Sequence, residues 1–193
     1  MSTTYPRTRR WTRAEYDRLI EEGVFQPGER LELLAGQLVV REPQGTPHAT
    51  GIRLVTRALR EVFQQDIWNV DMQLPVALDE DSEPEPDVAV TAGEPRDFLP
   101  SHPARPVLVV EVAEATLALD REEKGSLYAR ARVPEYWILN LRGRVLEVYR
   151  ESHPDPAALH GWAYRSRQNL AAGEHVAPLA APTARIAVVD LLP

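Results

Sequence analysis

The chain has 193 residues, a formal net charge of −7 and no cysteine. This length fits one domain with a sizeable core, and the lack of cysteine excludes a disulfide scaffold, a thiolate metal site and a cysteine nucleophile. No run of about eighteen apolar residues is present and no apolar leader follows the basic N-terminus, so we expect a cytoplasmic protein without a membrane span. The acidic balance argues against general coating of nucleic acid but leaves room for a local basic patch.

The N-terminal part of the chain predicts a helix, a β-hairpin and a second helix. Thr12 and Glu15 match a capping box, which predicts a helix over residues 12–22. Two short alternating runs over residues 29–42 predict a hairpin. Apolar residues then recur at helical spacing over residues 48–65, which predicts the second helix.

The middle of the chain predicts the strands of a central sheet. Residues 68–78 and 88–90 are strand-like and flank an acidic, proline-broken loop over residues 79–87. Residues 107–113, VLVVEVA, are apolar at both alternations. We therefore expect this run to be a central strand that is covered on both faces.

The remaining pattern adds a helix and further strands. Residues 120–132 predict a helix, and residues 135–150 predict a hairpin. Beyond this hairpin the pattern weakens: residues 153–161 predict a surface loop, and late strands are expected near Tyr164 and over residues 186–189.

This order of elements predicts a mixed β-sheet flanked by helices, in class α/β with α+β character. No repeat or linker divides the chain, so residues 1–193 should form a single domain. Its core is expected over about residues 29–150, after the N-terminal helix over 12–22, and residues 151–193 form a C-terminal strand extension.

Two acidic residues are candidates for a functional site. Glu111 lies inside the apolar run over 107–113, where a carboxylate loses hydration and must be neutralised, hydrogen-bonded or bound to a metal. A structural ion pair is the simpler alternative. Asp87 ends the acidic loop and opens the next strand, so the two carboxylates can share a site if their strands are neighbours; otherwise Asp87 is an ordinary turn residue.

Lys124 is the third candidate, since it is the one lysine among 22 basic residues. On a helix over 120–132 it falls on the apolar stripe that packs against the sheet. The alternative is a lysine whose stem packs and whose amine reaches water, paired with Asp120 one turn earlier.

These residues stand in five segments that occur in a characteristic order: ERLELLAGQLV, SEPEPDVAV, LVVEVAEAT, DREEKGSLYARARVPEYWIL and RGRVLEVYR. The pattern resembles the putative restriction endonuclease domain family, formerly a domain of unknown function, of the PD-(D/E)XK nuclease superfamily. The resemblance covers about residues 29–150, and ARIAVVDLL fits the end of the family. It implies a restriction-endonuclease-like sheet with additional hairpins and a metal-dependent endonuclease that acts on DNA.

The resemblance also assigns roles to the three candidates. Asp87 and Glu111 match the ligands of Mg²⁺ or Mn²⁺, and Lys124 matches the catalytic lysine. In most of the superfamily that lysine lies two residues after the acidic residue, where this chain has Ala113. The family resembled here is one in which the lysine has moved to the following helix.

Two further residues match the family less specifically, and one stretch departs from it. Glu32 matches an additional acidic residue near the metal, and His48 matches a histidine that follows a proline. Each has an alternative, as a surface strand residue and a helix-start residue respectively. Members commonly continue after the acidic residue with serine and proline, whereas residues 114–116 here are Glu-Ala-Thr, so no role is assigned to them.

The chemistry implied by this set is phosphodiester hydrolysis. Carboxylates supply the hard oxygen ligands that Mg²⁺ prefers, and the cation activates water and acts as a Lewis acid. A compact ammonium group can orient that water or stabilise charge on the phosphate, a task for which the bulky, forked guanidinium of arginine is a poor substitute.

DNA contacts would have to come from local basic patches. One candidate patch surrounds Trp11 and the other follows the second helix; their members are Arg7, Arg9, Arg10, Arg13, Arg53, Arg57 and Arg60. Solvated arginines in an arginine-rich chain are the alternative, and the acidic loop over 79–87 would repel DNA unless it is neutralised.

Two other functions remain open from the sequence. The fold could be a catalytically vestigial nuclease that serves as a nucleic-acid-binding or protein-interaction module, or the site could hydrolyse a different phosphoester. A homodimer is expected only on the ground that cutting both strands of a duplex favours two sites related by a dyad.

Overall fold

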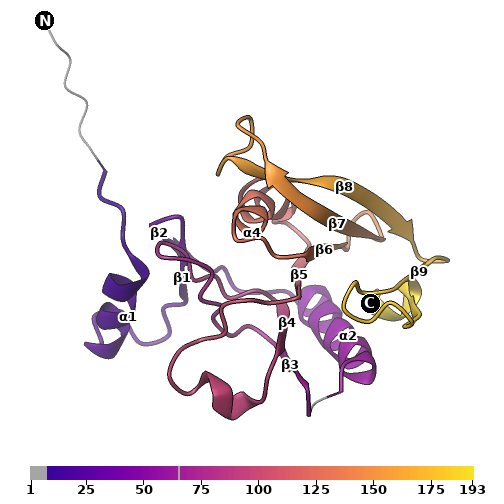
Figure 1. The fold of residues 1–193 in the computed structure, drawn as a ribbon, viewed down its shortest axis with the longest axis horizontal. Helices are drawn as coiled ribbons and strands as arrows, with labels where there is room; N and C mark the ends of the chain where they lie inside the picture. The colour runs from indigo at the N-terminus through magenta and orange to yellow at the C-terminus, as the bar shows by residue number, and fades with distance from the viewer. Residues whose placement is uncertain (1–7, 65) are drawn as a thin grey trace, which may run out of the picture.

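The computed structural model describes residues 8–64 and 66–193. Its centre is a six-stranded sheet in the order β3-β4-β5-β6-β7-β8 (Figure 1). The strands are β3 (Trp68–Asp71), β4 (Val88–Ala92), β5 (Leu108–Ala113), β6 (Glu135–Asn140), β7 (Val145–Pro154) and β8 (Trp162–Ala171). Strands β5 and β6 are parallel and the other neighbours are antiparallel. The mixed sheet flanked by helices is the class that the sequence predicts.

The remaining elements pack around this sheet. They are α1 (Arg13–Glu21), the hairpin strands β1 (Leu31–Leu34) and β2 (Gln37–Val40), α2 (Thr46–Val62), the short helix η1 (Pro95–Phe98), α3 (Leu117–Leu119), the π-helical turn η2 (Asp120–Lys124), α4 (Gly125–Arg130), β9 (His175–Val176), β10 (Ile186–Ala187) and η3 (Val188–Leu191). Within the described ranges, no helix is long and apolar enough to cross a membrane.

Strand β5 is buried on both faces, as its apolar run predicts. One face, with Val110 and Val112, packs against α2 in the larger hydrophobic core. The other face, with Val109 and Ala113, packs with Tyr128 of α4 in a second core. Glu111 shares the alternation of this second face, so its carboxylate points toward α4 and away from α2.

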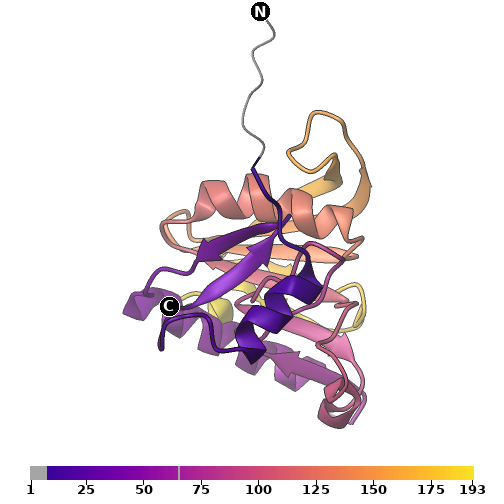
Figure 2. The same cartoon turned by 90° about the vertical axis from the view of Figure 1, so that its left-hand side faces the viewer.

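The N-terminal hairpin is fastened to the loop that precedes β4. The backbone N–H groups of Leu33 and Glu83 each donate to the other residue's carbonyl oxygen, at 3.3 and 2.7 Å. Figure 2 shows α1 and the strands β1 and β2 lying together in front of the central sheet. This docking brings β1, and with it Glu32, next to the start of β4.

Several predicted boundaries are wrong in the first half of the chain. The strand expected over 68–78 ends at Asp71, because Gln73 takes a positive φ of 51° and Pro75 lacks a backbone donor. The second helix begins at Thr46 rather than His48, since Pro47 suits the first turn of a helix. Its expected end at Gln65 lies outside the described residues, and the helix stops at Val62.

The C-terminal half contains more strand than its sequence indicates. Strand β7 runs on to Pro154, and β8 is a ten-residue strand where only the region of Tyr164 was expected. It is an edge strand whose exposed polar side chains weaken the hydrophobic alternation. The helix expected over 120–132 begins at Leu117 and passes through a π-helical turn before α4.

Gly51 lies at a point where α2 packs tightly against the sheet. A Cβ atom there would lie 3.0 Å from Val112 Cγ1 and 3.4 Å from Leu139 Cδ2. We therefore expect Gly51→Val to lower the free energy of unfolding by about 1–3 kcal/mol through overpacking, measured by urea denaturation. Gly173→Val is the control, because nothing lies within 4 Å of a Cβ at that position; equal effects of the two changes would contradict the tight packing at Gly51.

Candidate active site

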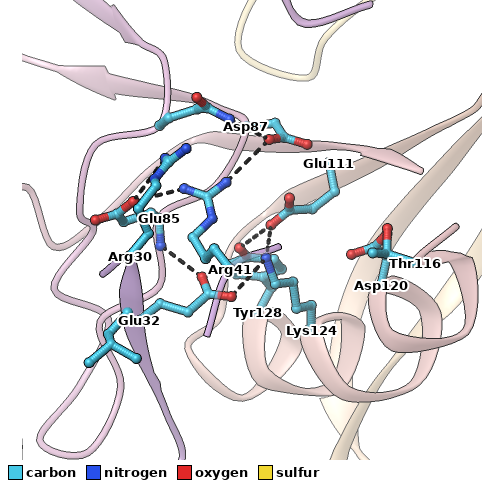
Figure 3. A network of polar contacts seen from close by, with 12 residues as sticks. Arg30, Glu32, Arg41, Glu85, Asp87, Glu111, Thr116, Asp120, Lys124 and Tyr128 are labelled. Atoms are coloured by element: carbon cyan, nitrogen blue, oxygen red, sulfur yellow. Dashed lines mark hydrogen bonds and ion pairs between the residues drawn. The ribbon is translucent and has the colours of Figure 1, made fainter. Parts of the chain in front are cut away.

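A cavity of about 230 Å³ lies where β4 begins and β5 approaches its end. The sequence-predicted residues Glu32, His48, Asp87, Glu111 and Lys124 all line it. The convergence of Asp87, Glu111 and Lys124 around one cavity, expected from their pattern, is therefore present; their chemical roles remain predictions. Figure 3 shows how the acidic and basic side chains point toward one another from the hairpin, the sheet and the π-helical turn.

Asp87 and Glu111 are brought together by the pairing of their strands. Val88 of β4 stands opposite Val110 of β5 in an antiparallel register, which makes the two acidic residues neighbours. Asp87 is 2% exposed, and its Oδ2 accepts a 2.9 Å hydrogen bond from the backbone N–H of Val112. Burial would raise its pKa, but the contact with His48 and this backbone hydrogen bond outweigh burial, so the pKa of Asp87 is lowered.

Glu111 has the opposite shift. It is 3% exposed, and its Oε1 accepts hydrogen bonds from Lys124 Nζ at 3.0 Å and from the Tyr128 hydroxyl at 2.7 Å. Burial raises the pKa of Glu111 to about 8, because Lys124 only partly offsets the lost hydration and the neighbouring carboxylates add repulsion. This raised pKa favours the protonated form of Glu111 relative to an exposed glutamate.

Lys124 reaches the cavity from the π-helical turn. In that turn the backbone N–H of Gly125 donates to the carbonyl oxygen of Asp120, five residues earlier, and such turns often occur at functional sites. Lys124 Nζ lies 3.0 Å from Glu111 Oε1 and 3.4 Å from Glu32 Oε1. Burial would lower its pKa, but Glu111 and Glu32 outweigh burial and keep the ammonium group charged.

Glu32 and His48, the two additional candidates, also reach this site. Glu32 comes from β1, and its Oε2 accepts a 3.1 Å hydrogen bond from the backbone N–H of Glu85. His48 lies in the first turn of α2, with Nε2 3.0 Å from Asp87 Oδ2. Burial would lower the pKa of His48, but Asp87 and Glu111 outweigh burial and raise it, which favours an imidazolium that pairs with Asp87.

Three residues of the site were not selected from the sequence. Asp120 lines the cavity and accepts a 2.6 Å hydrogen bond from the Thr116 hydroxyl, and Tyr128 binds Glu111. Both stand four residues from Lys124, and this spacing could have identified them. Arg41 contacts Asp87 and Glu85, but its place depends on the docking of the hairpin over β4, which no local pattern reveals.

The predicted DNA-binding arginines do not gather at this cavity. Arg7 lies outside the described residues. Arg10 donates to the carbonyl oxygen of Ala35 at 2.7 Å, and Arg9 pairs with Glu15 and lies over the Trp11 ring. A separate hollow beside α2 is lined by the other predicted group, namely Arg53, Arg57 and Arg60.

The acidic loop before β4 is held by several cations. Arg130 pairs with Asp79 and Asp81, and Arg13 donates from Nε to the carbonyl oxygen of Asp79 at 3.1 Å. Farther along, Glu85 pairs with arginines of the hairpin region. The repulsion of DNA expected from residues 79–87 is thereby reduced by intramolecular ion pairs.

The donor chemistry of the cavity fits a divalent cation with few protein ligands. In residues 8–64 and 66–193, no group of three or more His, Asp or Glu side chains is arranged to hold a metal ion. Asp87 and Glu111 nevertheless offer two hard carboxylates at one cavity. Mg²⁺ keeps several waters and is commonly held by one or two carboxylates together with substrate phosphates, so two ligands are compatible with it.

The comparison with solved structures supports the fold described above. A putative nuclease belonging to DUF820 from Anabaena variabilis is similar to this chain, with a TM-score of 0.65 and 17% sequence identity over 93% of this chain and 96% of that one. At this identity the similarity shows the fold alone. The family model Uma2, described as a putative restriction endonuclease, matches residues 13–188. The chain therefore belongs to the Uma2 family, which confirms the resemblance drawn from the five segments; no curated protein matches it.

The raised pKa of Glu111 predicts how stability depends on pH in the presence of a chelator. The carboxyl group has an ordinary value of 4.5 in the unfolded chain and about 8 in the folded protein. Below pH 4.5 both states are protonated; as pH rises toward 8, only the unfolded state releases the proton, so the folded wild type loses stability. Glu111→Gln cannot titrate, so we expect it to be the more stable protein at pH 8, by a margin that grows at up to about 1.4 kcal/mol per pH unit.

Thermal and urea unfolding of both proteins from pH 4 to 9 would measure this difference. Glu114→Gln is the control for loss of a carboxylate that also lines the cavity, and it should follow the wild type. A Glu111→Gln variant that is less stable than wild type at pH 8 would show that Glu111 serves as an ionised structural partner of Lys124.

Proposed function

We propose that the protein is a metal-dependent endonuclease that hydrolyses phosphodiester bonds of DNA. The observation that carries this proposal is the meeting of Asp87, Glu111 and Lys124 at one cavity, with the lysine amine 3.0 Å from Glu111. Membership in a family of putative restriction endonucleases supports nuclease chemistry. The cation, the DNA substrate and the roles of these residues are parts of the proposal.

Asp87 and Glu111 are the residues that would hold Mg²⁺ or Mn²⁺. The cation would supply Lewis acidity at a phosphate oxygen and make a water molecule easier to deprotonate. Asp87 is kept ionised by its lowered pKa, so it is ready to act as a ligand at neutral pH. Glu111 must lose its proton before it can ligate, so we expect metal affinity to rise as pH increases toward about 8.

Lys124 is suited to place a positive charge beside the reacting phosphate. Its ammonium group is held between Glu111 Oε1 and Glu32 Oε1, and a fixed donor of this kind stabilises charge that develops in the transition state. Tyr128 binds the same oxygen of Glu111, so the hydroxyl and the ammonium group together fix the orientation of that carboxylate.

A second hollow extends the cavity toward a basic turn. It shares Glu114 with the cavity, has a volume of about 460 Å³, and is lined by Arg142 and Arg144 of the β6–β7 turn. These arginines are suited to contact phosphates of a strand that enters the cavity. The arginines on α2, namely Arg53, Arg57 and Arg60, line a separate hollow and remain a predicted DNA-contact surface. Cutting both strands of a duplex at once would need two copies of the chain.

Cleavage by two matched variants tests the proposal. Plasmid, linear duplex, single-stranded DNA and RNA are incubated with wild type, Asp87→Asn and Lys124→Arg, with Mg²⁺, with Mn²⁺ and with chelator. We expect metal-dependent cleavage of DNA by wild type and losses of about 100-fold or more in both variants, because Asp87→Asn removes a ligand and arginine cannot occupy the narrow place of Lys124.

Mn²⁺ binding, followed by electron paramagnetic resonance, separates the two variants: Asp87→Asn should lose it, whereas Lys124→Arg should retain it. Asp71→Asn, in β3 and away from the cavity lining, is the control. Near-native cleavage by Lys124→Arg would contradict the role of the lysine. Absence of cleavage on every nucleic acid by well-folded wild type would favour the vestigial, binding-only alternative.

A further inference from the structure

We propose that Arg41 is an internal counter-cation of the metal site, which competes with the divalent cation for Asp87 and is displaced when the cation binds. This inference rests on the proposed function, because it assumes that Asp87 is a metal ligand. It assigns a purpose to Arg41, which among the described residues is the one arginine that lines the cavity.

Both carboxylate oxygens of Asp87 already contact protein groups. A carboxylate offers about four acceptor positions on its two oxygens. Oδ2 accepts a hydrogen bond from the Val112 N–H at 2.9 Å, and His48 Nε2 lies 3.0 Å from the same oxygen as an ion-pair contact. At Oδ1 the partners are Gln73 Nε2 at 3.2 Å and Arg41 at 3.4 Å. A metal ion that ligates Asp87 would therefore compete with these contacts, the longest of which is the 3.4 Å contact with Arg41.

Arg41 can also leave Asp87 without losing its other anchor. Its other contact, from Nη1 to Glu85 Oε2, is 2.8 Å long, so the guanidinium group keeps a strong anchor after Nη2 leaves Asp87. The Val112 N–H is fixed in β5, and His48 is fixed in the first turn of α2. Figure 3 shows the Arg41 guanidinium group spanning Glu85 and Asp87.

The charge of Arg41, in addition to its position, supports competition with a metal ion. The side chain is 9% exposed, and Glu111, Glu85, Glu32 and Asp87 all favour its charged form against the cost of burial. A positive charge held so close to both proposed ligands repels a divalent cation and occupies the electrostatic position that the cation would take. Once released from Asp87, Nη2 is free to donate to a phosphate oxygen of the substrate.

Mn²⁺ affinity of the full chain tests this inference with a readout that is independent of cleavage. Wild type, Arg41→Gln and Arg30→Gln are titrated with Mn²⁺ by isothermal calorimetry and electron paramagnetic resonance. Arg30→Gln is the matched control, because Arg30 pairs with the same Glu85 at 3.5 Å but does not contact Asp87. We expect Arg41→Gln to bind Mn²⁺ about tenfold more tightly than wild type and Arg30→Gln to bind it as wild type does.

The same variant should lose stability in chelator, where Arg41 offsets the carboxylates. In chelator, we expect Arg41→Gln to melt at a lower temperature than wild type. Addition of Mn²⁺ should restore its melting temperature. If Arg41→Gln does not fold, Glu85→Gln decides: removing the anchor lets Arg41 turn fully to Asp87, so Mn²⁺ binding should weaken several-fold, and unchanged binding would overturn the inference.

The outcomes separate this inference from the proposed function. If wild type binds Mn²⁺ through Asp87 and Arg41→Gln binds it equally or less tightly, the competition is refuted while the nuclease proposal stands. If neither wild type nor Arg41→Gln binds Mn²⁺, both proposals fall.

Discussion

The cost of burying carboxylates around one lysine is the constraint on which the arrangement of this molecule depends. Glu32, Asp87, Glu111 and Asp120 are each 2–3% exposed, and Lys124 stands among them at 5%. Each lost hydration shell must be replaced by donors. The fold supplies these donors from separate elements: backbone N–H groups of β5 and of the loop before β4, the Thr116 and Tyr128 hydroxyl groups, and the lysine itself.

This constraint explains why irregular parts of the fold occur where they do. The π-helical turn brings Asp120 and Lys124 to the cavity together, and a regular helix would set their directions differently. The segment after β3 leaves the sheet at Gln73, whose side chain donates to Asp87. Docking of the hairpin through Leu33 and Glu83 places Glu32 within reach of Lys124. The irregular segments are thus the ones that bring hydrogen-bond and ion-pair partners to the charged groups of the cavity.

The same reasoning shows how far the sequence alone could lead. Glu111 was found because an acidic residue in a doubly apolar strand is anomalous, and Lys124 because it is the one lysine on an apolar stripe. Arg41 could not be found, since arginine after a surface-like strand has no local anomaly and its contacts come from tertiary docking. Strand β8 was missed for a related reason: an edge strand is stabilised by pairing with β7, which leaves little trace in its own hydrophobic pattern.

The charge balance of the buried groups in the cavity is compatible with the proposed divalent cation. Four buried carboxylates of the cavity, those of Glu32, Asp87, Glu111 and Asp120, face the permanent cations Lys124 and Arg41, so two negative charges remain among these six groups when all four acids are ionised. Without a metal ion, bound protons offset this charge: the pKa values of Glu111, Asp120 and His48 are all raised, which favours the protonated form of each group. Two protons and one divalent cation are equivalent in charge. A divalent cation bound as proposed would replace protons of this kind, and its affinity would depend on pH because the same carboxylates bind both.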